Sequence, residues 1–369
     1  MHSVNLDYDP RNKIMAKLPN VSGEPEMTPD ESAFLCGLLN EIQPSKILEV
    51  GVAAGSATAI MLQCLEDGHY DYEMHSVDIS TRFYRDRTRE TGFLAKIAKE
   101  FLNHPNHHIY IGRNVASCLE EIGPGIDFLI MDTVHFLPGE ILDFLVILPF
   151  LRENSVVCLH DVAVSHYVPA MKNAHSCSVL FSNVTSKNKF INFTSDGKYP
   201  NIAAFQVTKE TRKHIIDIFL SLILRWYYVP SNDDLSLYVK VFQSTYGREC
   251  CKIFDEAVRM NIASFRHEIR EKLEKIPSDS NVLLYGAGLR GYSLYPFVKE
   301  LENIHILQWA DRDAKYLSVT GNIDIIAPKE IQADLIDYAL ITTENRPIIQ
   351  EVTNYLMGIG IPKDCILQI

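Results

Sequence analysis

With 369 residues, the chain exceeds one ordinary domain of about 100–200 residues and predicts two. Its formal net charge of −12 argues against a nucleic acid partner, because phosphate binding needs a basic face. The eight cysteines form no C-x-x-C pair and no regular spacing with histidine, which argues against a zinc site and against a disulfide framework.

Neither export nor membrane insertion is predicted. The N-terminal residues lack a basic region followed by an apolar run, so they do not look like a secretory signal. The longest apolar stretch, residues 215–229, contains Asp217 and Arg225 and is too short to span a bilayer. We therefore expect a cytoplasmic protein that acts on a small-molecule substrate, without a membrane partner.

Residues 1–208 predict an arm followed by an α/β domain. The arm, residues 1–27, is polar and contains proline. A capping box of Thr28, Pro29 and Glu31 then predicts a helix that ends before Pro44. Strands and helices alternate from there, and the predicted strands are residues 47–50, 74–78, 108–111, 127–131, 156–159, 189–193 and 202–207. This alternation predicts a doubly wound, mostly parallel sheet within residues 28–208, with helices on both faces.

The next segment, residues 209–276, is expected to be helical throughout. Its apolar residues recur at helical spacing and should form one stripe: Ile216, Phe219, Leu220, Ile223 and Trp226. We interpret this segment as a connector or as the surface of a homodimer.

A second, smaller unit is predicted for residues 277–369. A buried-type strand, residues 281–285, precedes Gly286, Gly288 and Gly291, and a second strand ends in Asp311. This spacing matches the dinucleotide-binding fingerprint, in which an acid follows about 20 residues after the glycines. Because only about 90 residues remain, there is room for one Rossmann-like half, and this half is a candidate second nucleotide site.

The most informative motif lies in residues 46–56, where an apolar strand leads into a turn of small residues that opens a helix. Gly51 and Gly55 let the backbone approach a ligand closely, Ala53 keeps the turn narrow, and the helix should begin near Ser56. The next strand ends in Asp78, whose carboxylate could accept both hydroxyls of a ribose. These residues predict an adenosine pocket.

A dehydrogenase fingerprint would have glycine at three positions. Here the acid Glu49 precedes the first glycine and the middle position is Ala53. This pattern, with Asp78 and the strands 126–132 and 155–161, resembles class I S-adenosylmethionine-dependent methyltransferases over residues 30–210. The resemblance implies that Glu49, Gly51, Ala53, Gly55, Ser56, Asp78, Gly112 and Asp132 bind S-adenosylmethionine.

A second polar cluster is expected at the carboxyl ends of neighbouring strands. Asp132, His135, His160 and Asp161 follow the fourth and fifth strands and could point into one cleft. Two carboxylates with water molecules suit Mg²⁺, so Asp132 and Asp161 are candidate metal ligands. The arrangement resembles the metal-dependent O-methyltransferases of the catechol and macrolide-sugar types, although the catechol type has an acid where this chain has His160. Without a metal, His135 or His160 could accept the proton of a substrate hydroxyl.

The resemblance implies a bacterial-type O-methyltransferase whose acceptor is a sugar, a nucleotide-sugar, or a natural-product or glycan precursor. Trp309, Tyr285 and Tyr292 could stack on a sugar ring. One alternative is an NAD(P)-dependent oxidoreductase or epimerase that uses the Gly286 unit, with Tyr295 and Lys299 at catalytic spacing. Another is a non-catalytic protein that senses nucleotides or organises an assembly. Structural roles for Asp132, His135, His160 and Asp161 also stay open.

Overall fold

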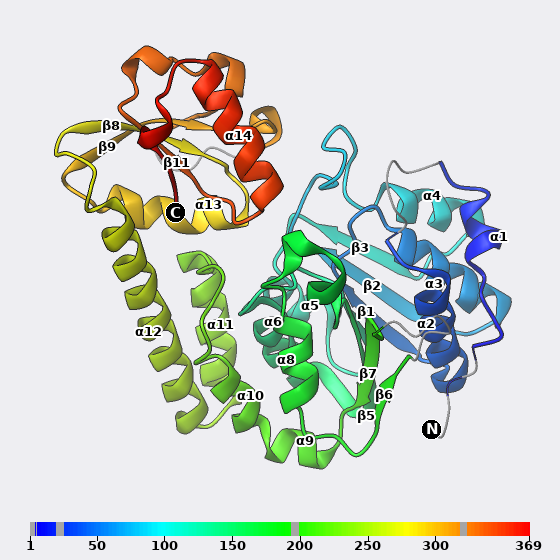
Figure 1. Ribbon diagram of the computed structural model, residues 1–369. Coiled ribbons are helices and arrows are strands. Elements are labelled where there is room, and N and C mark those ends of the chain that lie inside the picture. Colours follow the sequence, from blue (N-terminus) through cyan, green and yellow to red (C-terminus); the bar gives the residue numbers. More distant parts are fainter. Residues whose placement is uncertain (1–3, 5, 20–25, 193–198, 318–322) are drawn as a thin grey trace. The chain divides into compact units, whose positions relative to one another are not determined.

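The computed structural model describes residues 4, 6–19, 26–192, 199–317 and 323–369 (Figure 1). They fall into two compact units. The first unit lies within residues 1–167, 174–222 and 233–254, and the second within residues 168–173, 223–232 and 255–369. The predicted connector is thus divided between both units.

The first unit contains a seven-stranded sheet in the order β3-β2-β1-β4-β5-β7-β6. Its strands are β1 (Lys46–Val50), β2 (Glu73–Asp78), β3 (His107–Ile111), β4 (Ile126–Met131), β5 (Leu151–His160), β6 (Lys189–Ile191) and β7 (Ile202–Gln206). Strands β1 to β5 are parallel, and β7 is antiparallel to both β5 and β6. The predicted doubly wound, mostly parallel sheet is confirmed; residue 193 of the predicted sixth strand lies outside the described residues.

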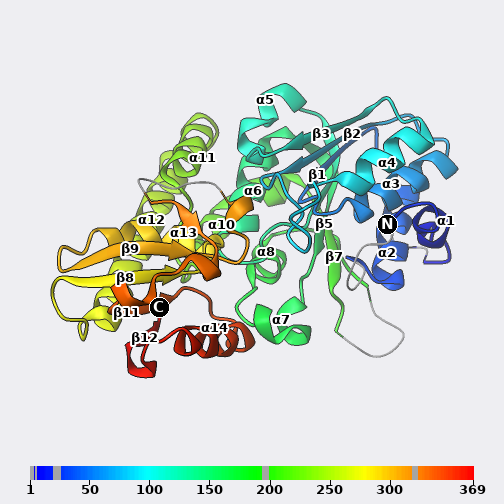
Figure 2. The same ribbon diagram turned by 90° about the horizontal axis from the view of Figure 1, so that it is seen from above.

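Helices cover both faces of this sheet (Figure 2). One face carries α1 (Arg11–Met15), α2 (Pro29–Ile42), α3 (Ser56–Asp67) and α4 (Phe93–Leu102), and the other carries α5 (Leu119–Ile122), α6 (Gly139–Ile147) and α8 (Ser176–Asn183). The predicted capping box forms, because Thr28 Oγ1 accepts from Glu31 N and Glu31 Oε2 accepts from Thr28 N. The chain winds away from β1 and β4 in opposite directions, so their carboxyl ends border a crevice that suits a ligand.

The prediction of a continuous helical connector is wrong over residues 222–231. Helix α9 (Lys209–Lys213) and α10 (Ile215–Ser221) are separated by this non-helical segment from α11 (Asn232–Thr245) and α12 (Arg248–Leu273). In the segment, Trp226 N donates to the side chain of Asn261 and Val229 N donates to Ser293 Oγ. These side chains replace helical carbonyl partners, and Pro230 cannot continue a helix. The expected stripe is therefore absent, and Ile223 is 48% exposed while Trp226 is buried.

The second unit contains a five-stranded parallel sheet in the order β10-β9-β8-β11-β12. Its strands are β8 (Ser280–Tyr285), β9 (Ile304–Ala310), β10 (Ile325–Ile326), β11 (Tyr338–Ile341) and β12 (Ile366–Gln368). Helix α13 (Leu289–Lys299) connects β8 to β9 and α14 (Arg346–Gly358) connects β11 to β12. The two connections run in opposite directions along the sheet, so right-handed crossovers put the helices on opposite faces.

Among the described residues, none of the helices combines the length and apolar character needed to cross a membrane.

Candidate active site

The turn after β1 takes a backbone shape that few residues tolerate. Gly51, Ala53 and Gly55 have φ of +92°, +49° and +91°. A Cβ on Gly51 would lie 1.8 Å from the carbonyl oxygen of Asp132, so glycine is required where the turn passes the end of β4. Helix α3 begins at Ser56, as predicted, and its N–H groups face the turn.

Asp78 at the end of β2 holds the turn in place. Its Oδ2 accepts from Val52 N at 2.8 Å and Ala53 N at 3.0 Å, and its Oδ1 accepts from Ser80 N at 2.7 Å. A carboxylate has about four acceptor positions, so one remains on Oδ1. That Asp78 accepts both hydroxyls of a ribose stays a prediction.

Two further residues, Gly112 and Glu49, were predicted to bind the methyl donor. Gly112 N donates to Asp78 O at 2.8 Å and has φ of +75° at the end of β3. Glu49 is 1% exposed, and its carboxyl group accepts from Thr58 Oγ1 of α3 at 2.8 Å. Burial raises the pKa of Glu49 to about 8. The contact of Glu49 is with α3, and its role as a direct ligand of the donor stays a prediction.

A residue that the sequence did not single out, Glu26, reaches the same turn from the arm. Its Oε1 accepts from Ala54 N at 3.0 Å, and its Oε2 accepts from Ser56 N at 3.4 Å and from Ser56 Oγ. Burial raises the pKa of Glu26. No motif marks this contact, because Glu26 is 30 positions from Ser56 in the chain.

The structure brings the four predicted acceptor-site residues together. His160 Nδ1 lies 3.1 Å from Asp132 Oδ1, and His135 Nε2 lies 3.1 Å from Asp161 Oδ2 and 3.5 Å from Asp132 Oδ1. Both His135 and Asp161 have left-handed backbones, with φ of +62° and +59°. We call Asp132, His135, His160 and Asp161 the acceptor cluster.

Two residues outside the predicted set, Glu31 and Asn201, complete one side of the acceptor cluster. The capping acid Glu31 lies 3.5 Å from His160 Nε2. Asn201 Nδ2 donates to Asp161 Oδ1 at 2.7 Å and to Glu31 Oε1 at 3.0 Å. In the sequence, the capping box marks Glu31 only as a helix-capping residue. No sequence motif marks Asn201 as part of the site. His160 is thus clamped between two acids, Asp132 and Glu31.

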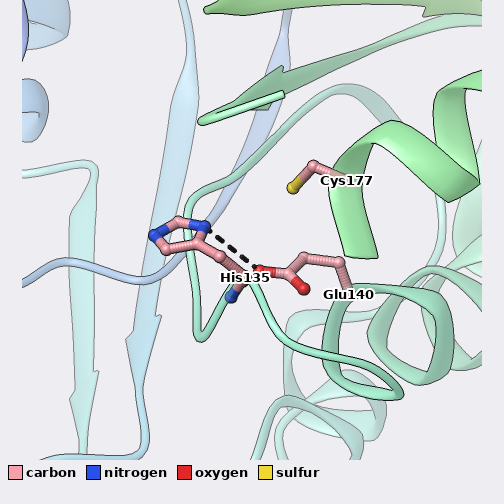
Figure 3. A group of neighbouring side chains, drawn as sticks. All are labelled: His135, Glu140 and Cys177. Carbon is pink, nitrogen blue, oxygen red and sulfur yellow. Dashed lines mark hydrogen bonds and ion pairs between the residues drawn. The ribbon is translucent and has the colours of Figure 1, made fainter. Parts of the chain in front are cut away.

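A third missed residue, Glu140, supports His135 from behind (Figure 3). Glu140 is fully buried, and its Oε1 accepts from His135 N at 2.6 Å and from Thr133 Oγ1 at 3.0 Å. The same oxygen lies 3.4 Å from His135 Nδ1. This contact turns the opposite ring nitrogen, Nε2, toward Asp161. Cys177, which is 1% exposed, lies beside them, with its sulfur within 4.8 Å of a ligand atom of each.

The acceptor cluster is rich in negative charge. Its two imidazoles contact four carboxyl groups: Glu31, Asp132, Glu140 and Asp161. Burial alone would lower the pKa of His135, but the hydrogen bond with Glu140 and the charge of Asp161 raise this pKa to about 9. The charges of Asp132 and Asp161 likewise outweigh burial and raise the pKa of His160. Without a metal, these acids favour the protonated form of both histidines, and the surplus of acids favours a further cation.

Two groups of described residues have the geometry to hold a metal ion: Asp132, His135 and Asp161, and His135, Glu140 and Cys177. Within each group the ligand atoms lie within 4.8 Å of one another. The first group has oxygen and nitrogen ligands 3.1–3.5 Å apart, a spacing that suits neighbouring ligands of one small cation. Asp132 and Asp161, the predicted ligands, thus lie where one ion could contact both.

In the second unit, the Gly286 turn repeats the arrangement seen at Asp78. Asp311 Oδ2 accepts from Ala287 N at 2.7 Å, and Gly286 has φ of +106°. A Cβ on Gly291 would lie 2.1 Å from Gly286 O, whereas one on Gly288 would meet nothing within 4 Å. The glycines thus have the packing that a nucleotide turn needs, and nucleotide binding there stays a prediction.

The expectation that Trp309 stacks on a sugar ring is wrong. Trp309 is fully buried, stacks on Tyr295 with ring centroids 4.7 Å apart, and donates through Nε1 to Gly286 O. Tyr292 packs edge-on against the same indole, at 5.2 Å. The oxidoreductase alternative also loses support, because Tyr295 is only 3% exposed.

Comparison with known proteins gives a family match within the first unit. Residues 48–162 match a family model described as a methyltransferase domain. A comparison with curated proteins gave no match.

Three solved structures are similar to about half of the chain, with TM-scores of 0.37–0.38. An O-methyltransferase from Bacillus cereus in complex with S-adenosylhomocysteine is 17% identical and covers 53% of this chain and 90% of its own. The O-methyltransferase TomG from Streptomyces achromogenes, involved in tomaymycin synthesis, is 15% identical with coverages of 56% and 91%. The Podospora anserina methyltransferase PaMTH1 is 11% identical with coverages of 54% and 86%. These values carry no argument about activity.

The assignment rests on the family match and on the sheet. Strands β1 to β5, the glycine turn after β1 and the acid at the end of β2 all lie within or beside the matched residues. Residues 48–162 therefore match a methyltransferase domain, within a Rossmann-like α/β fold.

Proposed function

We propose that the chain transfers a methyl group from S-adenosylmethionine to a hydroxyl oxygen of a small acceptor. The observation that supports this most is that the glycine turn and the acceptor cluster border the same crevice. Gly51 and Asp132 lie in contact where β1 and β4 end, and Asp161 ends the neighbouring β5. A donor and an acceptor bound there would meet.

The methyl donor, S-adenosylmethionine, would be bound by the turn between β1 and α3. Asp78 has one acceptor position left for a ribose hydroxyl. The next residue, Ile79, is 60% exposed and offers an apolar surface on which adenine could rest. The N–H groups at the start of α3 suit a carboxylate, and Glu26 shows that a carboxylate fits there.

On the acceptor side, the chain's own residues orient the hydroxyl and manage its proton. Asp161 and Asp132 each have a carboxylate oxygen near His135 Nε2, at 3.1 Å and 3.5 Å. If Mg²⁺ is bound by Asp132 and Asp161, it lowers the pKa of the acceptor hydroxyl. Without a metal, the neighbouring acids raise the pKa of His135 and His160, which favours a carboxylate as the proton acceptor in that state.

A ring-shaped acceptor, such as a sugar or a nucleotide-sugar, is the substrate class that we favour. Two exposed aromatic residues, Tyr167 and Tyr199, flank the acceptor cluster in sequence, after Asp161 and before Asn201. The Tyr167 hydroxyl donates to Tyr199 O, and the rings of His166 and Tyr199 lie 5.0 Å apart. Exposed aromatic faces of this kind can stack on a sugar ring. They take over the role that Trp309 cannot fulfil.

The test is methyl transfer itself. The full chain is incubated with S-adenosylmethionine and a panel of free sugars, nucleotide-sugars and catechols, with Mg²⁺ or with a chelator. Mass spectrometry then detects S-adenosylhomocysteine and a methylated product. We expect an O-methylated sugar from the wild type and loss of turnover in Asp161→Asn with unchanged S-adenosylhomocysteine affinity.

The matched control is Asp127→Asn, because Asp127 accepts from Ser45 and Lys46 at the amino end of β1, away from the crevice. This variant should keep full turnover. Full turnover in Asp161→Asn would remove the acceptor cluster from the reaction. Activity that survives the chelator would favour a side chain over a metal as the group that activates the hydroxyl.

A further inference from the structure

The Glu26 carboxylate occupies an anion-binding position formed by Ala54 N, Ser56 N and Ser56 Oγ, beside the proposed donor site. We call this position the carboxylate seat. The two oxygens of Glu26 accept from Ala54 N at 3.0 Å, Ser56 N at 3.4 Å and Ser56 Oγ. These donors include the first N–H of the 12-residue helix α3, where the helix dipole favours an anion. Glu26 thus binds in the way that a ligand carboxylate would bind.

The methyl donor carries such a carboxylate on its methionine part. Each N–H group has one hydrogen and makes one good hydrogen bond, so Ala54 and Ser56 cannot serve Glu26 and the donor at once. Two carboxylates in this seat would also repel each other. Glu26 must therefore leave the seat before the donor carboxylate can enter it.

The neighbours of Glu26 show which part can move. Met27 is 2% exposed and packs in the core of the first unit, and Thr28 caps α2. The backbone just after Glu26 is therefore anchored, and the Glu26 side chain can leave by rotation about its own bonds. Burial raises the pKa of Glu26 and the nearby Asp132 adds to this rise, whereas the hydrogen bonds from Ser56 and Ala54 lower it.

We propose that Glu26 is a carboxylate latch, which closes the empty donor pocket by occupying the seat of the donor's α-carboxylate. This inference rests on the proposed donor site and adds regulation of access to it. A closed latch lowers the apparent affinity by the fraction of molecules that are open. If about one molecule in ten is open, S-adenosylhomocysteine binds about tenfold more weakly than it would without the latch.

The experiment is calorimetric titration of the full chain with two ligands. S-adenosylhomocysteine has the amino acid carboxylate, whereas 5′-methylthioadenosine keeps the adenosine and the sulfur but lacks the amino acid part. The variants are Glu26→Ala, which removes the latch, and Glu26→Gln, which keeps its shape without its charge. Asp30→Ala is the matched control, because it removes the same charge from an exposed position close by in the chain.

We expect Glu26→Ala to bind S-adenosylhomocysteine about tenfold more tightly, Glu26→Gln to lie between it and the wild type, and Asp30→Ala to match the wild type. The affinity for 5′-methylthioadenosine should stay the same in every protein. Unchanged or weaker S-adenosylhomocysteine binding in Glu26→Ala would overturn the latch while leaving the donor site intact. Absence of binding of both ligands to every protein would overturn the donor site itself and the latch with it.

Discussion

Substituting Asp78 by asparagine separates its two roles, support of the glycine turn and contact with the donor. Asp78 accepts three backbone N–H groups, from Val52, Ala53 and Ser80. An amide keeps one acceptor oxygen, so the variant loses at least one charge-assisted hydrogen bond. Hydrogen bonds to charged groups contribute about 1.5–3 kcal/mol each. We expect Asp78→Asn to lower the free energy of unfolding by about 1–3 kcal/mol.

Donor binding should suffer in addition, because the ribose hydroxyl loses its charged acceptor. A loss of about 1.5–3 kcal/mol corresponds to S-adenosylhomocysteine binding about 12- to 150-fold more weakly. Asp78→Asn should lose the same factor in affinity for 5′-methylthioadenosine, since that ligand has the same ribose. Calorimetric titration measures both affinities, and thermal unfolding measures the stability.

Asp127→Asn is the control, because Asp127 also accepts several hydrogen bonds, from Ser45 N, Ser45 Oγ, Lys46 N and Arg152. It lies at the opposite end of the sheet, so it should cost comparable stability and leave both affinities unchanged. If Asp78→Asn binds S-adenosylhomocysteine within about threefold of wild type, the donor role of Asp78 is refuted. Equal losses of affinity in both variants would refute it as well.

Two further predictions concern stability. Burial and then the charge of Glu140 raise the pKa of Asp143 from 3.8 to about 8, so the folded state keeps a proton that the unfolded state releases, and stability falls as pH rises between these values. The free energy of unfolding of Asp143→Asn, relative to that of the wild type, should therefore rise by about 1–3 kcal/mol from pH 4 to pH 8.5, as followed by thermal unfolding. A difference between the two proteins that does not change with pH would contradict this. Gly51→Ala should prevent folding or cost more than about 3 kcal/mol, because its methyl group meets Asp132 O, whereas Gly288→Ala should change stability by less than about 0.5 kcal/mol. Soluble yield and melting temperature measure both glycine variants, and equal values would contradict the contrast.

Much of the first unit follows from local patterns. The capping box at Thr28, the glycine turn after β1 and the acid at the end of β2 are fixed by short-range chemistry, and each lies where it was predicted. Sheet order then brings Asp132 and Asp161 together, because parallel strands end at one edge.

The remaining parts depend on contacts that no pattern encodes. Glu26 and Asn201 reach the site from positions far along the chain. The apolar spacing after Phe219 looked helical, but within residues 222–231 Asn261 accepts from Trp226 N and Ser293 accepts from Val229 N. Trp309 looked available for a ligand, yet its indole fills the core beneath the Gly286 turn. Long-range packing overrides local propensity in each case.

The two units share one local device, in which an acid at a strand end accepts from the glycine turn of the neighbouring strand. Asp78 accepts from Val52 N in the first unit, and Asp311 accepts from Ala287 N in the second. The device is therefore compatible with a nucleotide site in either unit, and it also stabilises the turn by itself.

Calorimetric titration of the purified chain with S-adenosylhomocysteine and, separately, with NAD⁺ tests the central claim most directly. Each ligand is titrated with and without Mg²⁺. We predict binding of S-adenosylhomocysteine in the micromolar range, independent of NAD⁺, and loss of this binding in Asp78→Asn. Binding of NAD⁺ alone would move the active site to the Gly286 turn and contradict the assignment of the donor pocket.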